Sequence, residues 1–229
     1  MTLPRADVAR GQRVGRCLSL PPAGVHVAPA VRVIPMEREV VITGIGGQGI
    51  QLMAKILAQA ACRQGRQVML FGIYMGMMRG GASDSTVVIS DEEIAAPPVI
   101  PRCWGVVAMH PAGLPALLPK LRPGGVVLAN TTLVTGQPDR PGIHFAGVPA
   151  TRIAEEAGNV MGGGMVALGA FAQLTGIVPV DSISAAMRES LPPHRQHLAD
   201  ANEVYLSAGA AYAREALSSV GFRAEHAGA

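Results

Sequence analysis

Three glycines spaced at i, i+2 and i+5 form the part of this sequence that is best suited to ligand chemistry. They lie in the run Gly44-Ile45-Gly46-Gly47-Gln48-Gly49, which directly follows the strand-like residues 39–43. Glycine reaches positive φ and lets the backbone approach a ligand closely. A helix that begins after such a turn points its N–H groups and the positive end of its dipole at the loop. Residues 44–49 are therefore a candidate phosphate-binding loop.

A second glycine cluster follows about thirty residues later, as Arg79-Gly80-Gly81. The arginine offers a planar fork of donors that suits a phosphate or a carboxylate, and the glycines let that fork and the backbone approach it. We expect an anion-binding or interface loop at the carboxyl edge of a sheet. A structural turn with an arginine salt bridge explains the same residues equally well.

The acidic and histidine residues give little support for catalysis on this chain. A nicotinamide-binding fold normally carries an acid about 20 residues after its glycine loop, yet no acidic residue occurs between Glu39 and Asp84. His110 is expected to be a structural turn residue, and His194 and His197 lack the acid or cysteine that would complete a metal site. No Gly-x-Ser-x-Gly elbow supports acyl transfer. We therefore expect no catalytic and no metal-binding residues.

Composition restricts the class of protein. Residues 1–35 hold five arginines and one aspartate, so the positive net charge belongs to this segment and not to a nucleic-acid-binding surface. We expect a disordered, basic, proline-rich extension here, with a structured arm as the alternative. The three cysteines form no C-x-x-C pair, which argues against zinc or iron–sulfur ligation and suits a cytoplasmic protein. No apolar run is long enough to span a membrane.

The remainder of the chain alternates strands and helices. This order predicts an α/β fold, a three-layer Rossmann-like domain over residues 36–218 with a mostly parallel central sheet and helices on both faces. Residues 219–229 are expected to form a disordered tail. The many methionines are interpreted as core filler, with a partner surface around Met75, Met77 and Met78 as the alternative. Expected strands are 39–43, 67–71, 85–90, 104–109, 126–129 and 143–148, and expected helices are 49–64, 111–118, 150–157, 160–174 and 194–216.

Taken together, the two glycine clusters and several shorter motifs resemble the gamma subunit of 2-oxoacid:ferredoxin (acceptor) oxidoreductases. The resemblance covers residues 38–212. The ordered pair of glycine loops is its specific part. The further matching segments are Ala54–Ala58, Ser90–Ile94, Leu121–Asn130, Asn159–Met161, Leu168–Ala170 and Asn202 to Gly209.

The resemblance implies a complex that converts a 2-oxoacid with coenzyme A into an acyl-CoA, carbon dioxide and two electrons. Thiamine diphosphate and Mg, bound by alpha and beta subunits, would do the carbanion chemistry. Iron–sulfur clusters, on the beta subunit or on a ferredoxin-like delta subunit, would carry the electrons, with an NAD-linked flavoprotein as a further possible partner. This chain lacks the corresponding motifs, so it is expected to bind none of these cofactors alone.

Within that family, the gamma unit is associated with the coenzyme A side of the active site. The expected cofactor-binding residues are Gly44, Gly46, Gly47, Gln48, Gly49, Arg79, Gly80, Gly81 and Asn130. Met75 to Gly81 lacks the acid that many relatives carry before the arginine, so the 2-oxoacid branch stays open. The alternatives are a stand-alone NAD(P)-binding Rossmann-type reductase and a purely structural subunit.

Overall fold

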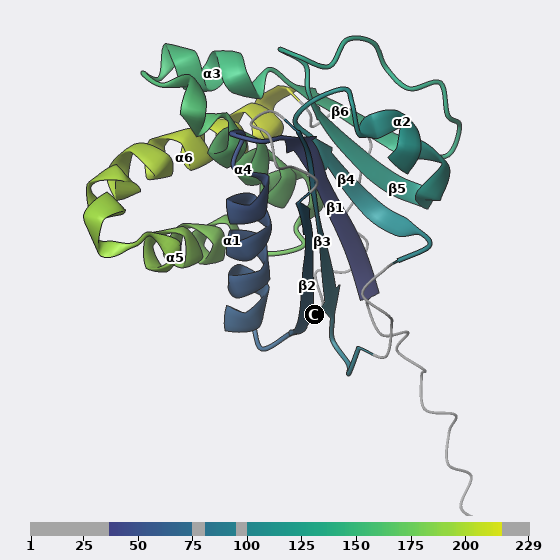
Figure 1. Ribbon diagram of the computed structural model, residues 1–229, viewed down its shortest axis with the longest axis horizontal. Coiled ribbons are helices and arrows are strands. Elements are labelled where there is room, and N and C mark those ends of the chain that lie inside the picture. Colours follow the sequence, from purple (N-terminus) through teal and green to yellow (C-terminus); the bar gives the residue numbers. More distant parts are fainter. Residues whose placement is uncertain (1–36, 75–80, 95–99, 217–229) are drawn as a thin grey trace, which may run out of the picture. The chain divides into compact units, whose positions relative to one another are not determined.

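The computed structural model describes residues 37–74, 81–94 and 100–216 (Figure 1). The expected extension at 1–35 and the expected tail at 219–229 lie outside these residues. So do Arg79, Gly80 and the three methionines between residues 75 and 78.

A six-stranded sheet forms the centre of the described chain, in the order β2-β3-β1-β4-β5-β6. β1 pairs in parallel with β4, which pairs in parallel with β5, and β5 with β6. The prediction of a mostly parallel sheet is confirmed, and β3 is the exception because it runs antiparallel to both β1 and β2. The strands are β1 Glu37–Ile45, β2 Gln67–Tyr74, β3 Ala82–Ser90, β4 Cys103–Ala108, β5 Leu121–Asn130 and β6 His144–Val148.

The antiparallel direction of β3 follows from the length of its connection. Only residues 75–81 separate β2 from β3, whereas a crossover to a parallel strand needs a dozen or more residues. The chain must therefore turn back beside β2. As a result, the carboxyl ends of β1 and β2 and the amino end of β3 meet at one edge of the sheet, with Ile45 opposite Ala82 and Tyr74 opposite Ser83.

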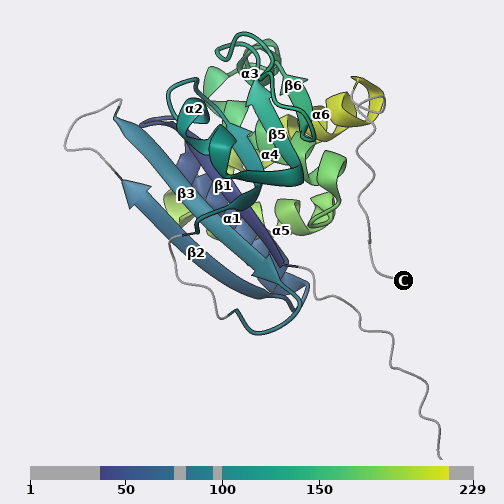
Figure 2. The same cartoon turned by 90° about the vertical axis from the view of Figure 1, so that its right-hand side faces the viewer.

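Helices cover both faces of the sheet unequally. The α1, α3, α4, α5 and α6 side contributes one large apolar core (Figure 1), while the short α2 and the strands beneath it form a smaller one (Figure 2). Helix bounds are α1 Ile50–Arg63, α2 Leu114–Leu117, α3 Ala150–Glu156, α4 Gly163–Thr175, α5 Val180–Ser190 and α6 Ala199–Ala216, with 3-10 turns at Leu118–Lys120, Val160–Gly162 and Pro193–Leu198.

The closest helix contact in this core joins α4 to α6. A Cβ on Gly169 would lie 2.1 Å from the carbonyl oxygen of Leu206, and one on Gly209 would lie 1.9 Å from that of Val166. Only glycine lets the two backbones approach so closely. The small residues between 160 and 174 thus allow close helix packing, as expected from their composition.

Four of the six expected strands are shorter than the observed ones, and the expected helices differ from the structure mainly in three places. No helix is predicted at 180–190, where α5 lies. The closing helix expected from 194 begins at Ala199, because Pro192 and Pro193 start a 3-10 turn at Pro193–Leu198. The helix expected at 111–118 is limited to Leu114–Leu117. The methionines within the described chain that are buried, including Met53, Met109 and Met187, do fill the core.

Candidate functional site

The first glycine run forms the turn between β1 and α1. Gly47 and Gly49 are exposed, with φ of 101° and 75°, a region that favours glycine. Gly49 is also the residue that caps α1, and no side chain of the described chain caps this helix end. The first turn of α1 holds no acidic residue. The N–H groups of this turn therefore meet no negative charge from the turn itself, which favours an anion at this helix end.

The side chain of Gln48 bends back into this turn instead of pointing outward. Its Oε1 accepts a hydrogen bond from the N–H of Ile45 at 2.9 Å, and its Nε2 donates to the carbonyl oxygen of Met109 at 3.2 Å. Gly44, which is buried, leaves room for it, because a Cβ there would lie 2.5 Å from Oε1. Gly44 and Gln48 thus shape the loop from inside.

The two glycine segments meet at this edge of the sheet. The N–H of Gly46 donates to the carbonyl oxygen of Gly81 at 2.9 Å, just beyond the last pair of the β1–β3 ladder, Ile45 with Ala82. Arg79 and Gly80 lie outside the described residues. The expected proximity of the two loops therefore rests on Gly46 and Gly81.

Asn130 ends β5 and is fully buried. Its amide nitrogen donates to the hydroxyl of Thr151 at 2.8 Å and to the carbonyl oxygen of Met109 at 3.4 Å. Its Oδ1 accepts from the N–H of Thr151 at 3.2 Å. Asn130 therefore holds the start of α3 against the ends of β4 and β5, and its polar atoms already have partners within the chain.

A polar network that the sequence analysis did not identify fastens α1 to β3. The hydroxyl of Ser85 donates to Oε1 of Gln51 at 2.7 Å, and Nε2 of Gln51 donates to the carbonyl oxygen of Asp84 at 3.2 Å. Gly72 makes room, because a Cβ there would lie 2.3 Å from Gln51 Oε1. One feature of the sequence could have indicated this network. Serines alternate in the strand 82–90, which would place two hydroxyls on the face of the sheet that α1 covers.

On the α2 face, Thr43 at the end of β1 donates its hydroxyl to Oδ1 of Asp84 at 2.6 Å. A Cβ on Gly113 would lie 1.9 Å from that same hydroxyl oxygen, so the turn before α2 approaches β1 very closely. The carboxylate of Asp84 is thereby held beside the glycine loops by a cross-strand partner.

Near the amino end of β1 lies Glu39, an acid whose pKa is shifted from its ordinary value. Glu39 is buried, its Oε1 pairs with the guanidinium of Arg122, and its Oε2 has no partner among the described residues. Burial raises the pKa of Glu39, and the nearby Arg122 charge opposes this. Burial, together with the Glu39 charge, also raises the pKa of the Cys103 thiol to about 11. Both groups lie toward the edge of the sheet opposite the glycine loops.

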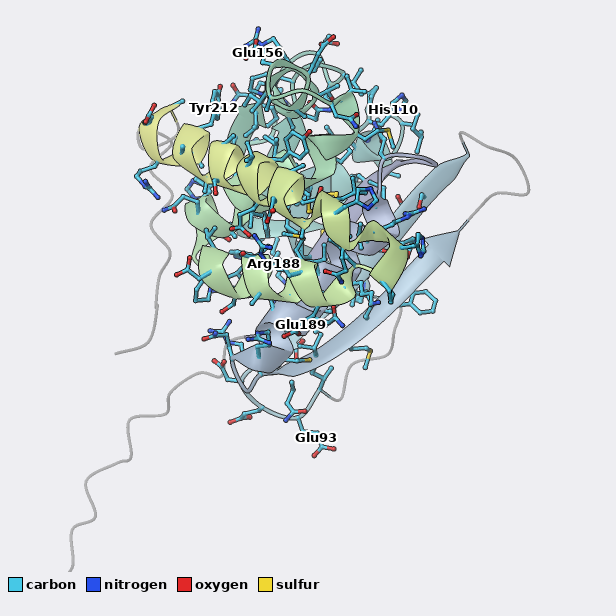
Figure 3. All side chains as sticks on the ribbon, turned by 90° about the vertical axis from the view of Figure 1, so that its left-hand side faces the viewer. Glu93, His110, Glu156, Arg188, Glu189 and Tyr212 are labelled. Carbon is cyan, nitrogen blue, oxygen red and sulfur yellow. The ribbon has the colours of Figure 1, made fainter. Side chains whose placement is uncertain are left out.

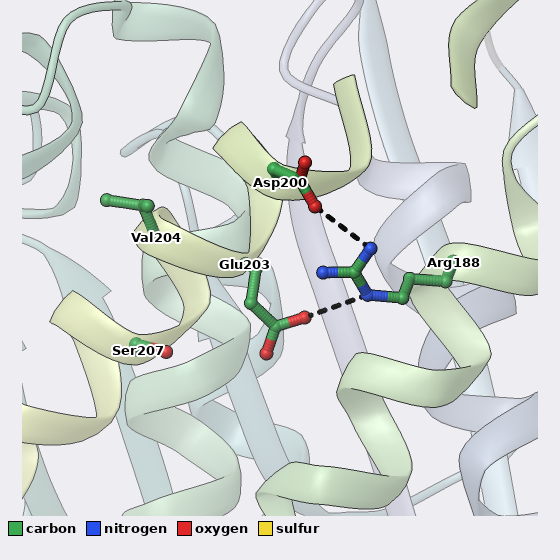
Figure 4. Close-up of a pocket in the computed structure, with 5 residues that line it drawn as sticks. All are labelled: Arg188, Asp200, Glu203, Val204 and Ser207. Carbon is green, nitrogen blue, oxygen red and sulfur yellow. Dashed lines mark hydrogen bonds and ion pairs between the residues drawn. The ribbon is translucent and has the colours of Figure 1, made fainter. Parts of the chain in front are cut away.

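The hollow between α5 and α6 is a poor candidate site. It is lined by Arg188, Asp200, Glu203, Val204 and Ser207 and has a volume of about 310 Å³. Arg188 is engaged by Asp200 at 3.1 Å and by Glu203 at 3.3 Å (Figure 4). Its charge is therefore neutralised within the chain. Figure 3 shows Arg188 on α5, well apart from His110 near the end of β4.

Among the described residues, neither a metal-binding cluster nor a membrane-spanning helix offers a second candidate site. No group of three or more His, Cys, Asp or Glu side chains in the described part of the chain could hold a metal ion. Of the helices that the structure describes, none has the length and apolar character to cross a bilayer.

Comparison with known proteins gives the family of the chain. Residues 39–212 match the family described as pyruvate ferredoxin/flavodoxin oxidoreductase. The 2-oxoglutarate synthase subunit KorC of Methanothermobacter marburgensis is 36% identical over 165 residues, which cover 69% of this chain and 88% of KorC. Ketoisovalerate oxidoreductase subunit VorA of Methanothermobacter thermautotrophicus is 34% identical over 183 residues, 78% of this chain. The match spans only 37% of the length of VorA.

A solved structure agrees in fold over almost its whole length. The gamma subunit of a keto/oxoacid ferredoxin oxidoreductase from Geobacter sulfurreducens superposes with a TM-score of 0.66 at 28% identity, covering 77% of this chain and 98% of that subunit. The chain belongs to the pyruvate ferredoxin/flavodoxin oxidoreductase family, in which it is of the gamma type.

Proposed function

We propose that this chain is the gamma subunit of a 2-oxoacid:ferredoxin (acceptor) oxidoreductase complex, in which it forms the coenzyme A side of the active site and part of the subunit interface. The hydrogen bond between Gly46 and Gly81 carries the proposal, because it brings both glycine segments to one edge of the sheet. The complex would oxidatively decarboxylate a 2-oxoacid to an acyl-CoA.

The geometry of the edge suits the phosphates of coenzyme A. Gly47 and Gly49 are exposed, and the uncapped first turn of α1 directs its N–H groups away from the helix. Backbone N–H groups at a helix N-terminus bind phosphate through hydrogen bonds and the helix dipole. Arg79 would add a bidentate, fully charged donor. Gln48 and Asn130 are already hydrogen bonded within the chain, so we assign ligand contact to the backbone and to Arg79.

The remaining chemistry is proposed to lie on other subunits. Thiamine diphosphate with Mg on alpha and beta subunits would supply the carbanion chemistry, and iron–sulfur clusters on the beta or a ferredoxin-like delta subunit would remove the electrons. An NAD-linked flavoprotein would serve instead if NAD is the acceptor. The relatives KorC and VorA, named for different 2-oxoacids, leave the substrate of this chain open.

Replacing Arg79 with alanine in the reconstituted complex tests the proposal. Loss of a charged hydrogen bond to a phosphate costs about 1.5–3 kcal/mol, so the apparent KM for coenzyme A should rise about 10- to 150-fold. The KM for the 2-oxoacid should stay the same. Arg195→Ala is the matched control, since Arg195 is exposed on the turn before α6. Unchanged turnover and unchanged KM for coenzyme A in Arg79→Ala would refute the assignment.

The alternatives give different results in the same set of assays. A stand-alone reductase should bind NAD(P)H at micromolar concentration in calorimetry on the full-length chain, and such binding would replace the proposal. A purely structural subunit should assemble with alpha and beta subunits, yet no photoreactive coenzyme A analogue should crosslink to residues 44–49 in the complex.

A further inference from the structure

We infer that Gln48 is a positioning residue, a side-chain latch that holds the glycine loop to the end of β4 and does not itself contact the ligand. The inference rests on the proposed function only in its consequence for coenzyme A. The latch itself is a property of the fold, so the two can be tested separately.

The carboxamide of Gln48 uses both of its ends within the chain. Oε1 accepts from the Ile45 N–H at 2.9 Å across the turn, and Nε2 donates to the Met109 carbonyl oxygen at 3.2 Å. Met109 lies 61 residues further along the chain and is buried. The amide offers two donor hydrogens and two acceptor lone pairs, and one bond at each end already holds the side chain toward the backbone of its own chain.

Two glycines lie against Gln48, one beside its side chain and one beside its backbone. A Cβ on Gly44 would lie 2.5 Å from Gln48 Oε1, a distance that real Cβ atoms essentially never show. On the other side, a Cβ on Gly164 would lie 3.2 Å from the Gln48 carbonyl oxygen. The first turn of α4 therefore packs directly on the loop. Gly44, the first glycine of the run, is explained by this packing without any ligand.

The latch continues into the neighbouring strands through one shared acceptor. The Met109 carbonyl oxygen also accepts from Asn130 Nδ2 at 3.4 Å, while the Met109 N–H donates to the carbonyl oxygen of Thr43 at 2.8 Å. Asn130 in turn bonds Thr151 at the start of α3. The glycine loop and the first turn of α3 are thereby fixed relative to the same carbonyl group at the end of β4.

Two substitutions of Gln48 separate the two halves of the latch. Gln48→Glu retains an acceptor for the Ile45 N–H, but it loses the donor to Met109 and places a carboxylate against a carbonyl oxygen. Gln48→Met is similar in size and loses both bonds. Gln137→Glu is the control for the added charge, since Gln137 is exposed in the segment between β5 and β6.

The first measurement is amide hydrogen exchange in the full-length chain. Loss of one hydrogen bond of about 1–1.5 kcal/mol should speed exchange of the Ile45 amide about tenfold in Gln48→Met, whereas Gln48→Glu should keep its protection. The second is the KM for coenzyme A in the reconstituted complex, which should rise about tenfold in both variants. The KM for the 2-oxoacid and both values for Gln137→Glu should not change.

The outcomes test two claims separately, the positioning role of Gln48 and the proposed coenzyme A role of the chain. Unchanged Ile45 exchange in Gln48→Met would overturn the latch. Faster exchange with an unchanged KM for coenzyme A upholds the latch and contradicts the proposed coenzyme A role. A raised KM without any change in exchange means that Gln48 contacts the ligand directly, which also overturns the inference. If Gln48→Met does not fold, Gly44→Ala provides the same test, because its Cβ displaces Gln48 Oε1.

Discussion

Gly209→Ala is expected to destabilise the chain, although alanine is the better helix former. In a helix interior this exchange alone would stabilise by about 0.5–1 kcal/mol. At Gly209, however, the new Cβ would lie 1.9 Å from the Val166 carbonyl oxygen, and ordinary contact begins at 3.4 Å. The backbones of α4 and α6 would have to separate by about 1.5 Å, which is 3.4 minus 1.9.

The size of the expected destabilisation follows from the packing contacts that α4 and α6 lose when they separate. A gap of 0.5–1 Å already forfeits a quarter to a half of the dispersion energy between two packed surfaces. Overpacking costs about 1–3 kcal/mol in general, and here both colliding groups belong to helices that cannot rotate away. We take about 3 kcal/mol as the cost of the collision and subtract about 1 kcal/mol for the better helix propensity of alanine. The net loss is about 2 kcal/mol, or about 4–8 °C in Tm for a chain of this size.

Urea and thermal denaturation of the full-length chain measure this loss. Ser207→Ala, on the exposed side of the same helix, is the control and should gain a few tenths of a kcal/mol from propensity alone. Gly169→Ala should resemble Gly209→Ala, and the double variant should lose less than the sum, since one separation relieves both collisions. A stabilising Gly209→Ala would show that α4 and α6 are not in backbone contact.

Three further predictions concern other parts of the fold. Arg122→Met leaves the buried carboxylate of Glu39 without its cation, so the free energy of unfolding should fall by about 2 kcal/mol at pH 8. Since burial raises the pKa of the Glu39 carboxyl in the folded chain, the contribution of this group to the free energy of unfolding is present at low pH and is lost as pH rises through the raised pKa. The loss of stability caused by Arg122→Met should therefore be smaller at pH 5 than at pH 8. A loss that does not depend on pH would contradict this reasoning. Thiol labelling at pH 8 with peptide mapping should modify exposed Cys62 in the folded chain and buried Cys103, with its pKa of about 11, only in denaturant, and equal labelling would refute the burial. Gln51→Leu leaves a buried serine hydroxyl on β3 unpaired and should cost about 1–2 kcal/mol, with faster amide exchange confined to the β2–β3 hairpin; unaltered exchange there would argue against this anchor.

Much of the architecture could be predicted because it depends on local patterns. The periodicity of residues 50–63 and the glycines before them specify a helix that begins after a turn, and both lie where expected. α5 was harder to identify, because its polar surface and flanking prolines obscure the apolar spacing of Ile183, Ala186 and Met187. The direction of β3 is not encoded in its alternation, which gives the period of a strand but not its orientation.

The inward orientation of Gln48 could not be read from its own neighbourhood. Its position within a glycine run suggests a ligand contact, but the side chain turns toward a carbonyl group that β4 brings from 61 residues away. Asn130 was similarly expected beside a ligand, and the structure shows that Thr151 and Met109 already bind its amide. Side-chain amides are satisfied by whichever backbone groups the fold places nearby, and that information is non-local.

The hairpin of β2 and β3 has a consequence for how the chain folds. β1, α1, β2 and β3 are consecutive over residues 37–90, and the β1–β3 and β2–β3 pairings both lie within that stretch. Short-range pairings have a low loop-closure cost, so we expect this half to form before the parallel strands. The two glycine segments would then meet early, yet the loop would gain its latch only when β4 delivers the Met109 carbonyl group. Pulse-labelled hydrogen exchange during refolding should protect the hairpin amides first, and simultaneous protection of β2 and β5 would rule out this order.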